Sequence, residues 1–175
     1  MCGGAYWRKG DDLFMLLANQ ICNLYSDIHF YWLGNMSIER ERVNRYDIKK
    51  MGIADNVHFI AETEFPNDFF PDMDVFVLTS REDSFPLSAI EAGLTALPIV
   101  CFENATGISE YIEGQDLTVP YLDLHAMSTK IITLYHDVEL CKRLGEINKL
   151  KFSSCLPKTI AKETLEILYL LQDNK

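Results

Sequence analysis

Short apolar runs alternate along this chain with longer segments of helical periodicity, and this alternation constrains the fold more than any other feature. The runs lie at residues 28–33, 57–60, 74–78 and 97–102, and their length and branched side chains are typical of buried strands. Strands that are separated by helices pair in parallel through right-handed crossovers. Parallel sheets are buried on both faces. The sequence therefore predicts an open α/β sheet with helices on both sides.

The remaining elements follow from local patterns. A charged helix is expected over residues 40–51, and Gly52 is typical of a helix stop. The other expected elements are a helix from residue 11 to 24, a short helix at 65–72, a helix that opens at 104–110, an edge strand at 117–120, helices at 123–135 and 138–150, and a last helix from Pro157.

Composition excludes several classes of protein. The 175 residues suit one domain, 48% are apolar and 24% are charged, and no apolar run approaches the roughly 18 residues of a membrane span. The formal charge of −10 argues against nucleic acid or an anionic membrane as the main partner. The five cysteines are scattered and the four histidines dispersed, so we expect neither disulfides nor a bound metal. These features, with no export signal at the start, predict a cytoplasmic protein.

Residues 80–93 are the stretch with the clearest chemistry. They lead from the apolar run 75–78 through a charged loop into a helix, on which Leu87, Ile90, Leu94 and Leu97 should form one buried stripe. Glu91 falls beside that stripe and can face a crevice. Asp83 and Glu91 are eight residues apart, or about 12 Å along a helix. That distance is too long for a glycosidase carboxylate pair but suits the two ends of an elongated ligand.

A glycine-rich loop at the start precedes the first helical pattern. Gly3 and Gly4 are followed by Arg8, Lys9 and Gly10, and such a junction offers backbone amides and a positive helix end to a phosphate. The order of residues does not match the P-loop motif. A phosphate contact at Lys9 is therefore expected without that motif.

The block from Asp83 through Glu91 to Ala92 and Gly93 resembles the Glu-x7-Glu motif of retaining glycosyltransferases of the GT-B fold. The resemblance implies that Asp83 lies near the donor sugar, as the catalytic carboxylate, and that Glu91 binds the ribose hydroxyls. Asp83 replaces the usual Glu, with Glu82 as a neighbouring candidate. Pro86 stands where many members have Gly, which removes one backbone donor.

Two further loops resemble the same family. Arg8 and Lys9 match the loop in which a lysine contacts the diphosphate, although Gly3 stands where many members have an arginine. Residues 104–110 resemble a Gly-Gly-x-x-Glu loop whose backbone approaches the diphosphate and the sugar. The donor-binding candidates are Lys9, Arg8, Glu82, Ser84, Phe85, Leu87, Glu91, Thr106, Gly107, Ile108 and Ser109.

The resemblance also implies an architecture. Residues 1–175 should form one Rossmann-like doubly wound domain, equivalent to half of a GT-B fold, which binds a nucleotide diphosphate sugar without a metal or other cofactor. Backbone groups of residues 61–65 should contact the base, which no side chain identifies. Only Met1 and Cys2 remain of the first strand, so a fragment without its N-terminal acceptor domain is expected. Such a fragment should be inactive alone and should self-associate.

Two alternatives stay open at this point. The first is a nucleotide-sugar epimerase on the same fold, which would need histidines and carboxylates for proton transfer. The second is a non-catalytic doubly wound module that binds protein partners through its acidic surface, since such folds host many functions. In the glycosyltransferase interpretation, the acceptor would be a saccharide or a lipid-linked saccharide.

Overall fold

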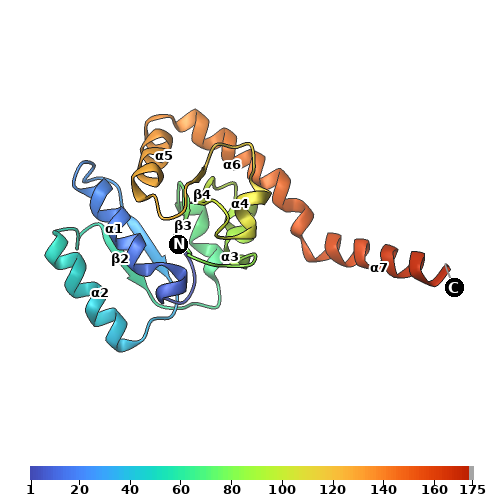
Figure 1. Cartoon of the computed structure of the whole chain (residues 1–175), viewed down its shortest axis with the longest axis horizontal. Helices are drawn as coiled ribbons and strands as arrows, with labels where there is room; N and C mark the ends of the chain where they lie inside the picture. Colours follow the sequence, from blue (N-terminus) through green and yellow to red (C-terminus); the bar gives the residue numbers. More distant parts are fainter. Residues whose placement is uncertain (174–175) are drawn as a thin grey trace.

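The computed structural model describes residues 1–173 and contains two parallel β-sheets flanked by helices (Figure 1). The α/β prediction is confirmed, and every expected strand is present: the strand at 57–60 has the predicted bounds, and the others are shorter. The strands are β1 (Phe30–Leu33), β2 (Val57–Ile60), β3 (Phe76–Leu78), β4 (Ile99–Phe102) and β5 (Thr118–Val119).

The helices also follow the predicted order. They are α1 (Asp11–Cys22), α2 (Ile38–Met51), α3 (Leu87–Leu94), α4 (Gly107–Tyr111), α5 (Leu124–His136), α6 (Val138–Phe152) and α7 (Pro157–Asp173), with 3₁₀ turns η1 (Trp7–Lys9), η2 (Pro66–Asp68), η3 (Phe70–Asp72) and η4 (Ser153–Cys155). The short helix expected at 65–72 is two separate 3₁₀ turns, each with a proline in its first turn. Prolines fit helix starts but interrupt a continuing ladder.

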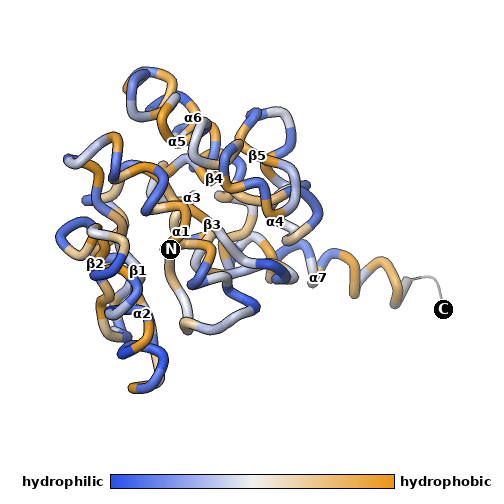
Figure 2. The backbone as a smooth tube through the Cα atoms, turned by 60° about the vertical axis from the view of Figure 1, so that its left-hand side comes forward, coloured by the Kyte–Doolittle hydropathy of each residue, from blue (hydrophilic) through white to orange (hydrophobic). Residues whose placement is uncertain are grey.

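The strands form two sheets. One has the order β1-β2 and the other β3-β4-β5, and every pair is parallel. The amino terminus lies between the two halves in both views (Figures 1 and 2), where Cys2 forms an isolated parallel bridge with Leu33 of β1.

Helix α1 is the centre of the hydrophobic core. Its Phe14 meets the rings of Phe30 and Trp32 edge-on, at 5.5 and 5.2 Å between centroids, and edge-on rings favour each other beyond their buried area. The helix also packs against α2 and α5. It therefore contacts elements of both halves of the molecule.

The predicted stripe on α3 is wrong in part. Leu87 is 73% exposed, whereas Ile90 and Leu94 are half-buried against the core and Leu97, beyond the end of the helix, is buried. The fully buried residues of the helix are Ala89, Ala92 and Gly93. The reason is close packing against α6. A Cβ atom on Gly93 would lie 2.2 Å from the ring of the buried Phe152, so only small residues fit this face.

Helix α7 projects from the body of the protein (Figures 1 and 2). Its apolar residues are exposed: Ile160, Leu165, Ile167, Leu168, Tyr169, Leu170 and Leu171. Within residues 1–173, no helix is both long and apolar enough to cross a membrane.

Candidate functional site

The Met1–Gly4 loop runs over the carboxyl end of β1 and forms the floor of the candidate site. The Gly3 amide donates to the carbonyl of Leu33 (2.8 Å), and the Trp32 indole donates to the carbonyl of Gly3 (2.9 Å). Gly34 approaches so closely that a Cβ there would lie 2.3 Å from the Gly3 carbonyl oxygen. The loop is therefore held from one side by β1 and the residue after it.

Lys9 is held at the end of η1 by a tight turn. Gly10 has a φ of 72°, and a Cβ on it would lie 2.1 Å from the carbonyl oxygen of Thr79. The buried Thr79 hydroxyl donates to the carbonyl of Gly10 (3.0 Å). These contacts join the loop that carries Lys9 to the end of β3.

Arg81 fixes the same loop, a role that the sequence analysis missed. Its guanidinium donates two 2.8 Å hydrogen bonds to the Asp12 carboxylate and one of 2.7 Å to the carbonyl of Trp7, and it lies 4.8 Å from the centre of the Trp7 ring. Bidentate pairs of this kind are geometrically specific. The one available signal was a charged residue three positions after the end of a buried strand.

Lys9 and Asp83 form an ion pair in the candidate site. The Lys9 ammonium donates to the Asp83 carboxylate, and the two side chains are only 13% and 11% exposed. The aliphatic end of Lys9 lies beside Gly3, where a Cβ would be 3.7 Å from Lys9 Cε. The chain thus places a cation, a carboxylate and a glycine loop together.

Asp83 does not belong to the helix, so the 12 Å estimate made along a helix does not apply to it. It lies in the loop before α3, where its amide donates to the carbonyl of Ala105 (2.9 Å) and its backbone bridges Thr106. The Gly107 amide donates to the carbonyl of Ser84 (2.8 Å). The two loops predicted to hold the donor therefore lie side by side.

Glu91 lies on α3 next to the Met1–Gly4 loop. Ser88, one turn earlier, donates to the carbonyl of Cys2 (3.1 Å). Burial raises the pKa of the Cys2 thiol, and the charges of Glu91, Lys9 and Glu62 also act on it. Burial raises the pKa of Glu91 as well. The charges of Glu91, Lys9 and Glu62 therefore lie within electrostatic reach of this loop.

A comparison of the sequence with known protein families identifies the family of this chain. The model of the family "Glycosyl transferases group 1" matches residues 1–137 of this chain. The chain belongs to this family.

A curated relative supports the assignment. The amylovoran biosynthesis glycosyltransferase AmsD of Erwinia amylovora is 24% identical over 121 residues, which are 69% of this chain and 34% of AmsD. The curated relatives that match are covered over 26–34% of their own length, so this chain spans about a third of them.

Solved structures confirm the fold. The C-terminal domain of a glycosyl transferase group 1 protein, LpcC of Francisella tularensis, superimposes with a TM-score of 0.77 at 18% identity, covering 87% of this chain and 82% of that one. A mutant of TarM of S. aureus, crystallised in complex with fondaparinux, α-GlcNAc-glycerol and UDP, gives a TM-score of 0.84 at 22% identity, covering 94% of this chain and 34% of TarM. The chain therefore has the fold of a GT-B half.

A small cavity adjoins the Met1–Gly4 loop. It has a volume of about 130 Å³ and lies at the carboxyl ends of β1 and β2, where ligands of open α/β sheets bind. Its lining residues are Cys2, Gly3, Gly4, Leu33, Gly34, Asn35, Glu62, Thr63 and Pro66. Residues 62 and 63 belong to the segment that was expected to contact the base.

Two buried hydroxyls near the ion pair lack a partner. The Ser80 side chain is fully buried and Thr106 is 6% exposed, and neither hydroxyl oxygen has a hydrogen-bond partner within the described chain. Buried polar groups without partners are uncommon and call for an explanation. A polar ligand that reaches the Ser80 and Thr106 hydroxyls would give them hydrogen-bond partners.

The other candidate residues differ in their exposure. Arg8, Glu82, Ser84 and Leu87 are exposed, and the Arg8 guanidinium contacts the Tyr6 hydroxyl (3.2 Å). Ile108 and Ser109 are buried, and the Ser109 hydroxyl donates to the carbonyl of Thr106 (2.7 Å). Phe85 is half-buried and packs edge-on against Tyr111. The Ser109 amide also donates to the carbonyl of Thr106 (3.1 Å), so this amide is already paired within the chain.

Among residues 1–173, no group of three or more histidine, cysteine, aspartate or glutamate side chains is placed to hold a metal ion. The prediction that the protein needs no metal remains a prediction. All five cysteines are free.

Proposed function

We propose that this chain is the donor-binding domain of a retaining glycosyltransferase and that it binds a nucleotide diphosphate sugar at the carboxyl ends of its strands. The observation that carries the proposal is the largely buried pair of Lys9 and Asp83 beside the glycine loop, with Glu91 on the adjoining helix. The Lys9 cation suits the anionic diphosphate of such a ligand, and the two carboxylates suit the uncharged hydroxyl groups of its sugar and its ribose, from which they can accept hydrogen bonds.

Each group has a distinct role in this proposal. The Lys9 ammonium contacts the diphosphate and stabilises the charge that develops as the nucleotide leaves. Asp83 accepts hydrogen bonds from the transferred sugar, and Glu91 accepts them from the ribose. The Ser80 and Thr106 hydroxyls, which are buried without partners in the described chain, are candidate donors to the phosphates or the sugar.

The complete protein would transfer the sugar to an acceptor. UDP in the TarM crystal supports a nucleoside diphosphate donor, and the name of AmsD supports a saccharide or lipid-linked saccharide as the acceptor. Retention of configuration is inferred from the Asp83-x7-Glu91 motif. The free cysteines favour action in the cytoplasm, where thiols stay reduced.

Calorimetric titration tests the proposal directly. Residues 1–175 should bind one of UDP, GDP or ADP more tightly than the matching monophosphate, because each charge-assisted contact is worth roughly 1.5 to 3 kcal/mol. The affinity should be unchanged in EDTA.

A double variant tests the role of the ion pair, and a substitution away from the site is the control. The double change Lys9→Met with Asp83→Asn removes both charges together and should abolish the preference for diphosphate, whereas Lys149→Met on the exposed face of α6 should not. Absence of nucleotide binding at millimolar concentration would reject the proposal in favour of a partner-binding module.

A further inference from the structure

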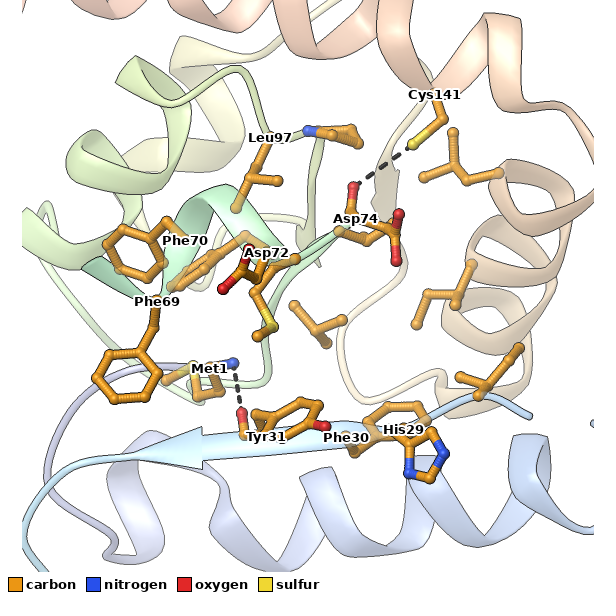
Figure 3. Close-up of a pocket in the computed structure, with 18 of the residues that line it drawn as sticks. Met1, His29, Phe30, Tyr31, Phe69, Phe70, Asp72, Asp74, Leu97 and Cys141 are labelled. Atoms are coloured by element: carbon orange, nitrogen blue, oxygen red, sulfur yellow. Dashed lines mark hydrogen bonds between the residues drawn. The ribbon is translucent and has the colours of Figure 1, made fainter. Parts of the chain in front are cut away.

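An acceptor must reach the sugar end of the donor, which the proposed function places at Asp83. The largest hollow of the described chain is elsewhere. It is a groove of about 690 Å³, and Figure 3 shows Phe30 and Tyr31 on one side of it with Leu97 across the opening. Its lining, within the part of the chain that the structure describes, includes neither Lys9 nor Asp83. A site for the acceptor must therefore lie on the surface beside the ion pair.

Two exposed aromatic side chains belong to the loop that carries Lys9. Trp7 is 66% exposed and Tyr6 is 43% exposed, and Trp7 is the first residue of the η1 turn that ends at Lys9. The Lys9 amide donates to the carbonyl of Tyr6 (2.8 Å), and the Arg81 amide donates to the carbonyl of Arg8 (2.8 Å). The backbone of the two aromatic residues is therefore fixed relative to Lys9.

Contacts within the chain also hold both rings in place. The Arg81 side chain is only 11% exposed, and its guanidinium lies 4.8 Å from the centre of the Trp7 ring, an attractive arrangement for a cation and an aromatic face. The Tyr6 ring lies 5.7 Å from the Arg8 guanidinium and packs on Gly4, where a Cβ would be 2.9 Å from Tyr6 Cε1. One face of the indole is thus covered by Arg81, and the exposure of Trp7 leaves the opposite face open.

The aromatic residues lie on the Asp83 side of the candidate site. The Tyr6 hydroxyl, and after it the charges of Asp83 and Glu82, raise the pKa of the Arg8 guanidinium. Both carboxylates are therefore within electrostatic reach of Arg8, the residue that follows Trp7. A sugar that accepts its position from Asp83 would lie near the open face of the indole.

The chemistry of this surface suits a sugar ring. The face of an aromatic ring carries negative charge density, and the C–H groups on the face of a pyranose carry the opposite polarity. Stacking the two also removes apolar area from water. The hydroxyls at the rim of the pyranose need hydrogen-bond partners, and the exposed side chains of Arg8 and Glu82 offer a donor and an acceptor.

We propose that the open face of Trp7, with Tyr6 beside it, is a stacking platform for a pyranose ring of the acceptor saccharide. This inference rests on the proposed function, because the platform serves transfer only where Asp83 holds the donor sugar. Trp7 binds the acceptor and sets the plane of its ring, while Lys9, Asp83 and Glu91 bind the donor.

The NMR resonances of the two indole N–H groups test this platform, because the chain has two tryptophans. Trp32 is fully buried and its indole donates to the carbonyl of Gly3, so its resonance is an internal reference. The methyl glycosides of glucose, galactose, mannose and N-acetylglucosamine are titrated in turn. At least one should shift the Trp7 resonance saturably and leave that of Trp32 in place, whereas glycerol at the same concentration of hydroxyl groups should shift neither.

A pair of variants separates the aromatic face from the rest of the side chain. Magnetisation transfer from the protein to the glycoside that binds should be lost in Trp7→Leu and retained in Trp7→Phe. Because both substitutions remove the indole, a loss confined to Trp7→Leu reports the need for an aromatic ring. Equal transfer in Trp7→Leu and the parent would overturn the platform.

The result also separates the platform from the donor site. A Trp7 shift by a glycoside in a chain that binds no nucleotide would support the platform and reject the proposed function. Nucleotide binding without a Trp7 shift by any glycoside would overturn the platform and leave the donor site standing. A nucleoside diphosphate that shifts Trp7 and blocks the glycoside would likewise overturn it, since the base would then cover the indole.

Discussion

At the scale of single residues, the contact between Lys9 and Asp83 sets the condition for ligand binding. In the structure the lysine is already paired with a carboxylate, so a diphosphate must share or replace that partner. Asp83 is thus both a proposed sugar ligand and an internal competitor for the phosphate site. The two roles can be separated experimentally.

Asp83→Asn should tighten the binding of a nucleoside diphosphate that carries no sugar, because the negative charge that competes for Lys9 is removed. We expect roughly tenfold, or about 1.4 kcal/mol. The same variant should lose the extra affinity that the sugar provides. Calorimetry with and without the sugar measures both, and Asp116→Asn, which removes the exposed partner of Lys130, is the control. Weaker diphosphate binding by Asp83→Asn would contradict this role.

Glu91→Gln should weaken nucleotide binding without lowering Tm. A lost pair of hydrogen bonds to a charged acceptor costs about 1.5 to 3 kcal/mol of binding. Burial raises the pKa of Glu91 in the folded state. Glu91 therefore contributes fully to the free energy of unfolding below its unfolded pKa, and this contribution is lost as the pH rises through its folded pKa. At pH 7 the ionised Glu91 carboxylate does not stabilise the fold, so its replacement by glutamine should not lower the free energy of unfolding. Glu146→Gln on the exposed face of α6 is the control.

The same pKa shift predicts the pH dependence of binding. Only ionised Glu91 accepts two hydroxyl hydrogen bonds, so nucleotide affinity should fall on acidification at a pH above the ordinary glutamate value of 4.5. The Glu91→Gln variant should lack that step. Titrations from about pH 4 to about pH 8 with both proteins, a range that spans the usual spread of carboxyl pKa values, would show it. Identical profiles would assign the titration to another group.

At the scale of elements, α3 carries Glu91 and is positioned by glycine contacts with α6. A Cβ on Gly145 would lie 1.9 Å from the carbonyl oxygen of Ala96, and one on Gly93 would meet the Phe152 ring. Backbone atoms cannot move aside as a flexible side chain can. Helix α6 must therefore meet α3 and the turn at Ala96 through glycine.

Gly145→Ala should destabilise the fold by about 1 to 3 kcal/mol, the usual cost of overpacking. Urea unfolding would measure the change. Glu146→Ala, one residue further along α6 and exposed, should remain within about 0.5 kcal/mol of the parent. A Gly145→Ala protein as stable as the parent would show that α3 and α6 can separate without cost.

Elements were predictable from sequence to the extent that their signals are local. The strand at Phe76–Leu78 and the helix stop at Gly52 follow from composition and turn chemistry. The buried face of α3 was not predictable, because hydrophobic periodicity favours large apolar residues, whereas close packing of two helices selects small ones. The Arg81 contact with Asp12 joins residues 69 positions apart, so no local pattern reveals it. The neighbouring positions of Asp83 and Thr106 depend in the same way on the pairing of β3 with β4.

At the scale of the whole molecule, the apolar surface of α7 predicts association. Seven large apolar residues on this helix are exposed, more than a soluble surface usually carries in one place. Residues 1–175 should sediment as larger species as the protein concentration is raised, whereas a chain that ends at Leu156 should stay monomeric. Equal behaviour of the two chains would place the association elsewhere on the molecule.

The projection of α7 also has a consequence for how the monomer tumbles. Seventeen helical residues extend about 25 Å at 1.5 Å per residue, so rotation about the helix axis meets less friction than end-over-end rotation. In dilute solution the backbone nitrogens of α7, whose N–H bonds point along that axis, should show longer T1 and shorter T2 relaxation times than those of the central strands.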